Sequence, residues 1–194
     1  MKDYKIMNIF FTTVLTLCLV SCGSGTNEQS VCSEDEERIR FVIKGEIDYS
    51  LRHGDMDKGI ALIKAAERIY KDDASLQYIK GIVYYKQGRN ELAEDAFRRA
   101  FSLYDSLLER APSLNYALNK ASCLLFIADS AEYNRELDSV CNMEYYRKES
   151  PALGEYIDML RSLSREDVCE GCFRSADSME IVNSTLPASG YTLN

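Results

Sequence analysis

Two features of the sequence predict an all-α fold built from antiparallel helix pairs. Apolar residues recur with helical spacing almost from end to end, and no convincing alternating strand pattern is present. Two neighbouring segments also repeat at a spacing of 34 residues, so that Gly54, Ala66 and Tyr70 recur as Gly88, Ala100 and Tyr104. A period of this length is typical of a helix–turn–helix unit, which buries its apolar face by stacking on neighbouring units.

The helices can be placed in order from their apolar stripes and from the residues that end them. Gly54 follows the first stripe, where a helix needs a left-handed residue, and Gly88-Arg89 separates the next pair. Asp129-Ser130 and Ser150-Pro151 can each begin a helix. The expected helices span residues 35–53, 56–70, 75–87, 90–109, 113–128, 129–143, 151–163 and 164–182.

The first two helices each carry a stripe of apolar residues that we expect to face the core. The stripe of the first helix consists of Ile39, Val42, Ile43, Ile47 and Leu51. The second stripe consists of Ile60, Ile63, Ala66 and Ile69. Their three- and four-residue spacing places each set on one side of its helix.

The second repeated unit resembles the tetratricopeptide repeat family. Gly81 falls at the helix-packing glycine of that family, Tyr84 follows three residues later, and Ala93, Phe97 and Ala100 occupy the expected offsets in the partner helix. The resemblance implies a TPR-like right-handed solenoid with C-terminal capping helices. Its units would be clear repeats at 40–73 and 74–107, a degenerate third repeat at about 112–147, and capping helices at 150–182.

The amino terminus resembles the signal peptide of a bacterial lipoprotein. Lys2 and Lys5 precede a short apolar run that ends in Leu19-Val20-Ser21-Cys22, which is similar to a lipobox. The resemblance implies that residues 1–21 are removed and that Cys22 is acylated, which would attach the chain to a lipid bilayer. Residues 22–33 are then a flexible tether, 34–182 the helical domain, and 183–194 a disordered tail.

Charge restricts the partners that this chain can have. Without residues 1–21 it carries 21 basic and 30 acidic side chains, which argues against binding nucleic acid or gripping anionic lipid through basic residues. We expect a location in the cell envelope, facing the periplasm or the surface. Gly23 after Cys22, in place of an Asp, favours the outer membrane where the host uses that residue for sorting.

Few residues suggest catalysis. His53 is the only histidine, and its place beside Gly54 indicates a helix carboxyl end. Cys169 and Cys172 form the only close cysteine pair, and the spacing leaves open a structural disulfide, two reduced thiols or a redox-active pair. Zinc needs four ligands at paired close spacings, so the sequence predicts no metal site and no cofactor.

We therefore expect a scaffold or adaptor that binds a protein or peptide, and not an enzyme. Two alternatives stay open: a thiol/disulfide protein that uses Cys169 and Cys172, and a structural subunit whose groove is filled by its own carboxyl-terminal helix. The sequence does not predict the oligomeric state. Carried over from the family, the concave partner-binding face consists of Phe41, Lys44, Asp48, Leu51, Arg52, Ser75, Tyr78, Ile82, Tyr85 and Lys86.

Overall fold

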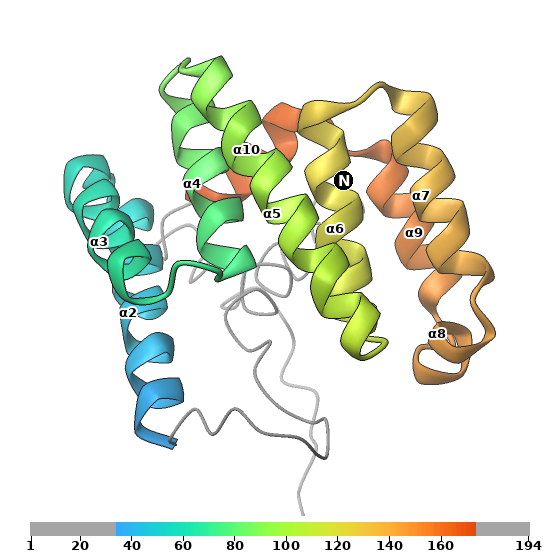
Figure 1. The fold of residues 1–194 in the computed structure, drawn as a ribbon. Helices are drawn as coiled ribbons and strands as arrows, with labels where there is room; N and C mark the ends of the chain where they lie inside the picture. Colours follow the sequence, from blue (N-terminus) through green and yellow to red (C-terminus); the bar gives the residue numbers. More distant parts are fainter. Residues whose placement is uncertain (1–33, 174–194) are drawn as a thin grey trace, which may run out of the picture.

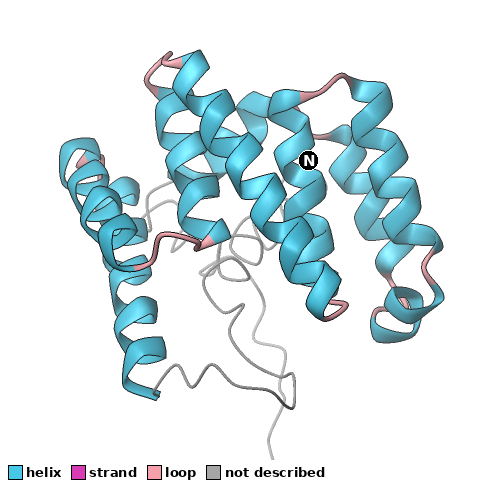
Figure 2. Cartoon of the chain, in the orientation of Figure 1, coloured by secondary structure: helices cyan, strands magenta, loops and turns pink. Residues whose placement is uncertain are grey.

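The computed structural model describes residues 34–173, which form nine helices and no strand (Figures 1 and 2), so the all-α prediction is confirmed. The expected signal peptide, Cys22, the tether, the carboxyl-terminal tail and residues 174–182 of the last expected helix lie outside this range. The helices are α2 (Glu34–Arg52), α3 (Met56–Ile69), α4 (Ala74–Lys86), α5 (Asn90–Arg110), α6 (Leu114–Ile127), α7 (Ser130–Asn142), α8 (Glu144–Glu149), α9 (Leu153–Ser162) and α10 (Arg165–Phe173).

The helices pack mainly against their neighbours in the chain. The pairs α2–α3, α4–α5, α5–α6 and α6–α7 share the most extensive contacts, and Figure 1 shows them side by side with short turns between them. The helix α10 departs from this order, because it returns to contact α2 and α4. In Figure 1 it lies behind α4 and α5.

Two turns 34 residues apart have the same geometry. Gly54 and Gly88 have φ angles of 77° and 71°, in the left-handed region that favours glycine. Asp55 N donates to Ser50 O and Arg89 N donates to Tyr84 O, each at 2.9 Å. These are the long hydrogen bonds of a Schellman helix ending. The sequence repeat is therefore also a repeat of backbone structure.

Glycine also allows the helices of each of these pairs to approach closely. A Cβ atom on Gly81 of α4 would lie 2.8 Å from the ring of Phe97 in α5. A Cβ atom on Gly59 of α3 would lie 2.6 Å from a methyl carbon of Leu51 in α2. We expected Gly81 to let its helix approach the partner helix closely, and the structure shows such an approach at this position.

The two glycines Gly81 and Gly45 should respond oppositely to alanine. Gly45 lies in α2, and a Cβ atom there would meet nothing within 4 Å. Gly45→Ala should therefore raise the free energy of unfolding by about 0.5–1 kcal/mol. Gly81→Ala should lower it by about 1–3 kcal/mol, because Phe97 is fully buried and must move. Urea unfolding would measure both variants, and a stabilised Gly81→Ala would contradict this packing.

Three residues expected in the core are instead exposed. Ile39 and Val42 in the first turns of α2 are 52% and 61% exposed, and Ile69 at the end of α3 is 66% exposed. The helix α3 has 14 residues against 19 in α2, so it is too short to cover the whole of its partner. Ile69 is the last residue of its helix, where the chain turns away.

In the carboxyl-terminal half, the helix expected to run to about Met143 ends at Asn142, and the start of the next expected helix was placed two residues too early. The chain breaks at Met143 and continues as the short helix α8, which the apolar pattern did not indicate. The next helix begins at Leu153 instead of Pro151, after a turn in which Leu153 N donates to Ser150 O at 3.1 Å. By contrast, Asp129 caps α7 as expected, accepting a hydrogen bond from Glu132 N at 2.8 Å.

Candidate partner-binding face

The predicted partner-binding residues lie on α2 and α4, which are also the helices that α10 contacts most extensively. On α4, the hydroxyl of Tyr85 donates a 2.7 Å hydrogen bond to Glu166 of α10. The Lys86 ammonium lies 5.7 Å from the centre of the Phe173 ring. The chain's own last described helix therefore covers part of the face that the resemblance assigns to a partner.

The five predicted residues of α2 have different surroundings. Phe41 is 57% exposed, whereas Leu51 is buried in the core. Asp48 accepts hydrogen bonds from Arg52 one turn later, at 2.8 and 2.9 Å, and both side chains are half-buried. Burial raises the pKa of Asp48 from its ordinary value, and the Arg52 guanidinium partly offsets this. Phe41 is thus the accessible member of this set.

Lys44 of α2 is buried and forms an ion pair with Asp73, the residue that precedes α4. Its ammonium lies 2.8 Å from Asp73 Oδ2, and the Arg40 guanidinium nitrogen lies 3.8 Å from the same oxygen. The other oxygen of Asp73 caps α4 by accepting from Ser75 N and Leu76 N. Lys44 therefore connects α2 to the start of α4 and is not available on the surface.

The predicted residues of α4 divide between the core and the contact with α10. Ser75 is buried, and its hydroxyl donates to Asp73 at 2.6 Å. Tyr78 and Ile82 are also buried, and the Tyr78 ring meets the Phe97 ring edge-on with 5.4 Å between centroids. Tyr78 thus packs against the next helix and is not exposed as an anchor for a partner. Only Tyr85 and Lys86 of this set reach α10 through the polar contacts described above.

Contacts at both ends hold α10 in place. At its start, Arg165 donates to Leu125 O at 2.6 Å and to Ala128 O at 3.3 Å, which are carbonyls at the end of α6. Ser164 and Asp167 cap the helix reciprocally through backbone and side-chain hydrogen bonds. At its end, Phe173 packs against two hydrophobic clusters formed by residues 34–173, one centred on α4, α5 and α6 and the other between α2, α3 and α4.

The close cysteine pair lies on the buried side of α10. Cys169 and Cys172 are both buried, and no disulfide joins any of the four cysteines within residues 34–173. Burial raises the pKa of the Cys169 thiol above its ordinary value of 9.0, although Lys86 partly opposes the shift. A protonated and buried thiol reacts slowly, because the thiolate is the nucleophile. This environment favours a packing role over a redox role.

His53 lies directly after α2, at the helix carboxyl end that its place beside Gly54 indicated. His53 Nδ1 lies 2.8 Å from Tyr49 O, and the two rings stack with 3.9 Å between centroids at the end of α2. Within the described part of the chain, no group of three His, Cys, Asp or Glu residues is arranged to hold a metal ion. None of the helices in residues 34–173 is both long and apolar enough to cross a membrane.

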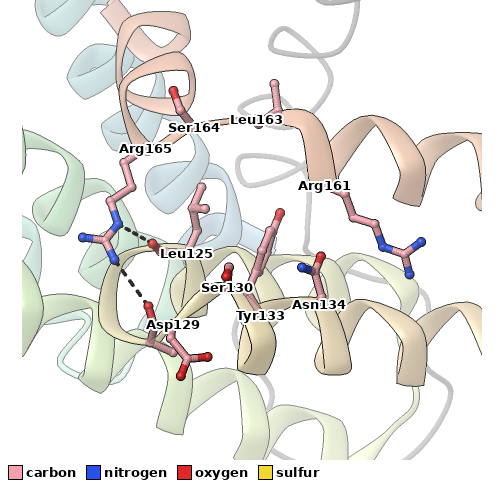
Figure 3. Close-up of a pocket in the computed structure, with 10 residues that line it drawn as sticks. Leu125, Asp129, Ser130, Tyr133, Asn134, Arg161, Leu163, Ser164 and Arg165 are labelled. Atoms are coloured by element: carbon pink, nitrogen blue, oxygen red, sulfur yellow. Dashed lines mark hydrogen bonds between the residues drawn. The ribbon is translucent and has the colours of Figure 1, made fainter.

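A pocket of about 270 Å³ lies where the α6–α7 turn meets the segment between α9 and α10 (Figure 3). Sequence reasoning missed it, because its two walls are about 30 residues apart and share no local motif. The pocket is lined by Leu125, Ala128, Asp129, Ser130, Tyr133, Asn134, Arg161, Leu163, Ser164 and Arg165.

Most of the polar groups in this pocket are already engaged with the protein. Arg165 binds the carbonyls at the end of α6, as the dashed lines in Figure 3 show. Arg161 pairs with Asp138 and Asp158. Tyr133 donates to Leu160 O at 3.1 Å, and burial raises the pKa of its hydroxyl to about 12. The pocket is best explained as a structural joint that fixes the start of α10.

Comparison with known proteins adds no family to this description. No protein-family description, curated protein or solved structure matches the chain at a significant level.

Proposed function

We propose that this chain is a lipid-anchored scaffold of the bacterial cell envelope, built as a TPR-like right-handed solenoid that binds a protein or peptide partner. The observation that carries the proposal is the repeated backbone geometry at Gly54 and Gly88, 34 residues apart. Such repeats build extended surfaces rather than enclosed pockets, and their usual role is binding.

The location follows from the amino-terminal pattern. Cys22 would carry the acyl chains and residues 22–33 would connect them to the helical domain. Multiple acyl chains on one residue anchor a protein stably, whereas a single chain binds only marginally. The excess of acidic side chains leaves the acyl anchor as the main attachment to the bilayer.

A structural subunit with a filled groove is the second candidate, and the position of α10 favours it. The helix covers part of the α2 and α4 face through Tyr85 and Lys86. A thiol/disulfide activity is less well supported, because Cys169 is buried and its pKa is raised. The two favoured candidates differ in whether a second protein is bound.

Replacing Cys22 tests the anchor and the partner in one experiment. We expect Cys22→Ala to abolish acylation, to leave residues 1–21 uncleaved, and to reduce the set of proteins crosslinked to this chain in intact membranes. Mass spectrometry of the amino terminus and of the crosslinked proteins provides the measurements. Identical amino termini without lipid mass in both forms would reject the anchor. A wild-type chain that crosslinks to no other protein would favour the structural subunit.

A further inference from the structure

The helix α10 shows what kind of ligand the α2–α4 face can hold. Its side chains follow a regular pattern: acidic Glu166, then Val168 and Cys169, then Cys172 and Phe173. Val168, Cys169 and Cys172 are buried, while Glu166 meets the Tyr85 hydroxyl at the edge of the contact. Residues three and four positions apart are neighbours on a helix, so Glu166, Cys169 and Phe173 form one row and Val168 and Cys172 form the adjacent row, with Glu166 and Val168 at opposite edges of the contact.

Arg165 fixes the start of α10, but several contacts along the rest of the helix are individually weak. Nine residues of helix are marginal in water on their own, so α10 depends on its contacts with the rest of the chain. Two of its three buried apolar side chains are the small thiols of Cys169 and Cys172. The Tyr85–Glu166 hydrogen bond and the Lys86–Phe173 contact are open to water. Such contacts contribute little individually in exposed positions.

We propose that the partner of this scaffold is an amphipathic helix that carries the α10 pattern and replaces α10 on the α2–α4 face. The proposal rests on the proposed binding function and adds the chemical nature of the partner. An attached segment competes at an effective concentration in the millimolar range, so an incoming helix must be longer or more apolar than α10 to displace it.

The buried thiols provide a direct measurement of displacement. The probe is a synthetic peptide with the sequence of residues 164–173, alanine in place of both cysteines, and helix-forming turns added at each end. It is added to the full chain with iodoacetamide, and the labelling of each cysteine is followed by peptide mapping. We expect saturating peptide to raise the labelling rates of Cys169 and Cys172 at least tenfold. Cys123, fully buried in α6, should not change.

A matched peptide and two variants make the test decisive. A peptide with glutamate at the positions of Val168 and Phe173 should leave labelling unchanged. The full-length variants Arg165→Ala and Val168→Asp should respond to at least tenfold lower concentrations of the first peptide, because their own α10 is held less firmly. Arg165→Ala leaves the buried side of α10 intact, so it remains informative if Val168→Asp does not fold.

Two results would overturn the proposal. One is continued protection of Cys169 and Cys172 at millimolar peptide. The other is rapid labelling of both thiols without peptide, which would mean that α10 does not occupy this face. The proposed scaffold function is tested separately by membrane crosslinking. If a partner is crosslinked but Cys169 and Cys172 stay protected from labelling, the scaffold function holds and displacement of α10 is rejected. If the peptide exposes both thiols to labelling but no partner is crosslinked, α10 can be displaced and the scaffold function is rejected.

Discussion

Phe97→Ala should lower the free energy of unfolding by about 3–5 kcal/mol. The Phe97 ring of α5 is fully buried and joins three helices. It stacks on Phe126 of α6 with 4.1 Å between centroids and meets the edge of Tyr78 of α4. Gly81 of α4, which lies against this ring, has no side chain that could move into the space of a missing ring. Alanine therefore creates a cavity in addition to removing apolar contact.

Phe41→Ala provides a matched control for this prediction. The same side chain is removed, but Phe41 is 57% exposed on α2, so the free energy of unfolding should change by no more than about 0.5 kcal/mol. Urea unfolding followed by circular dichroism would measure both variants. Equal decreases in the free energy of unfolding for Phe97→Ala and Phe41→Ala would mean that Phe97 does not lie at the centre of the core.

Local patterns predicted the helices well. The capping residues and the apolar spacing placed most helix ends within one or two residues, as at Gly54, Gly88 and Asp129. These signals act within a few residues of the chain, so one sequence is enough to read them. The close approach at Gly81 could also be predicted, because the family pattern assigns that residue to helix packing.

Coverage by distant segments could not be read from the same patterns. An apolar stripe shows which side of a helix avoids water, but it does not show whether another element covers it. Ile39 and Val42 were therefore expected in the core, although no helix within residues 34–173 covers them enough to bury them. The return of α10 to α2 and α4 joins residues about 80 positions apart, as in the Tyr85–Glu166 contact. Helical periodicity contains no information on such pairs.

Lys44→Met should cost about 3 kcal/mol of folding free energy near neutral pH. Methionine keeps the length of the side chain but leaves the buried Asp73 carboxylate without the ammonium that lies 2.8 Å away. An uncompensated buried charge typically costs 3–5 kcal/mol. The lower value applies here because Arg40 lies 3.8 Å from the same oxygen and the cap hydrogen bonds of α4 remain. Lys58→Met is the control, since its 3.7 Å pair with Glu46 is exposed and should contribute less than about 1 kcal/mol.

The pH dependence distinguishes a lost ion pair from a loss of packing. Burial alone would raise the pKa of Asp73, but Lys44 and the hydrogen bonds from Ser75 and Leu76 outweigh it and hold the pKa below its ordinary value of 3.8. The contribution of Asp73 is therefore present above about pH 4 and is lost as the pH falls through the lower, folded-state pKa. In Lys44→Met the ammonium no longer opposes the effect of burial, so the pKa of Asp73 should rise. Protonation of Asp73 in acid should then remove the cost of its unpaired buried charge. The stability difference from wild type should thus shrink as the pH falls from 7 towards 4. A difference that stays constant over this range would show that Lys44 acts through packing alone.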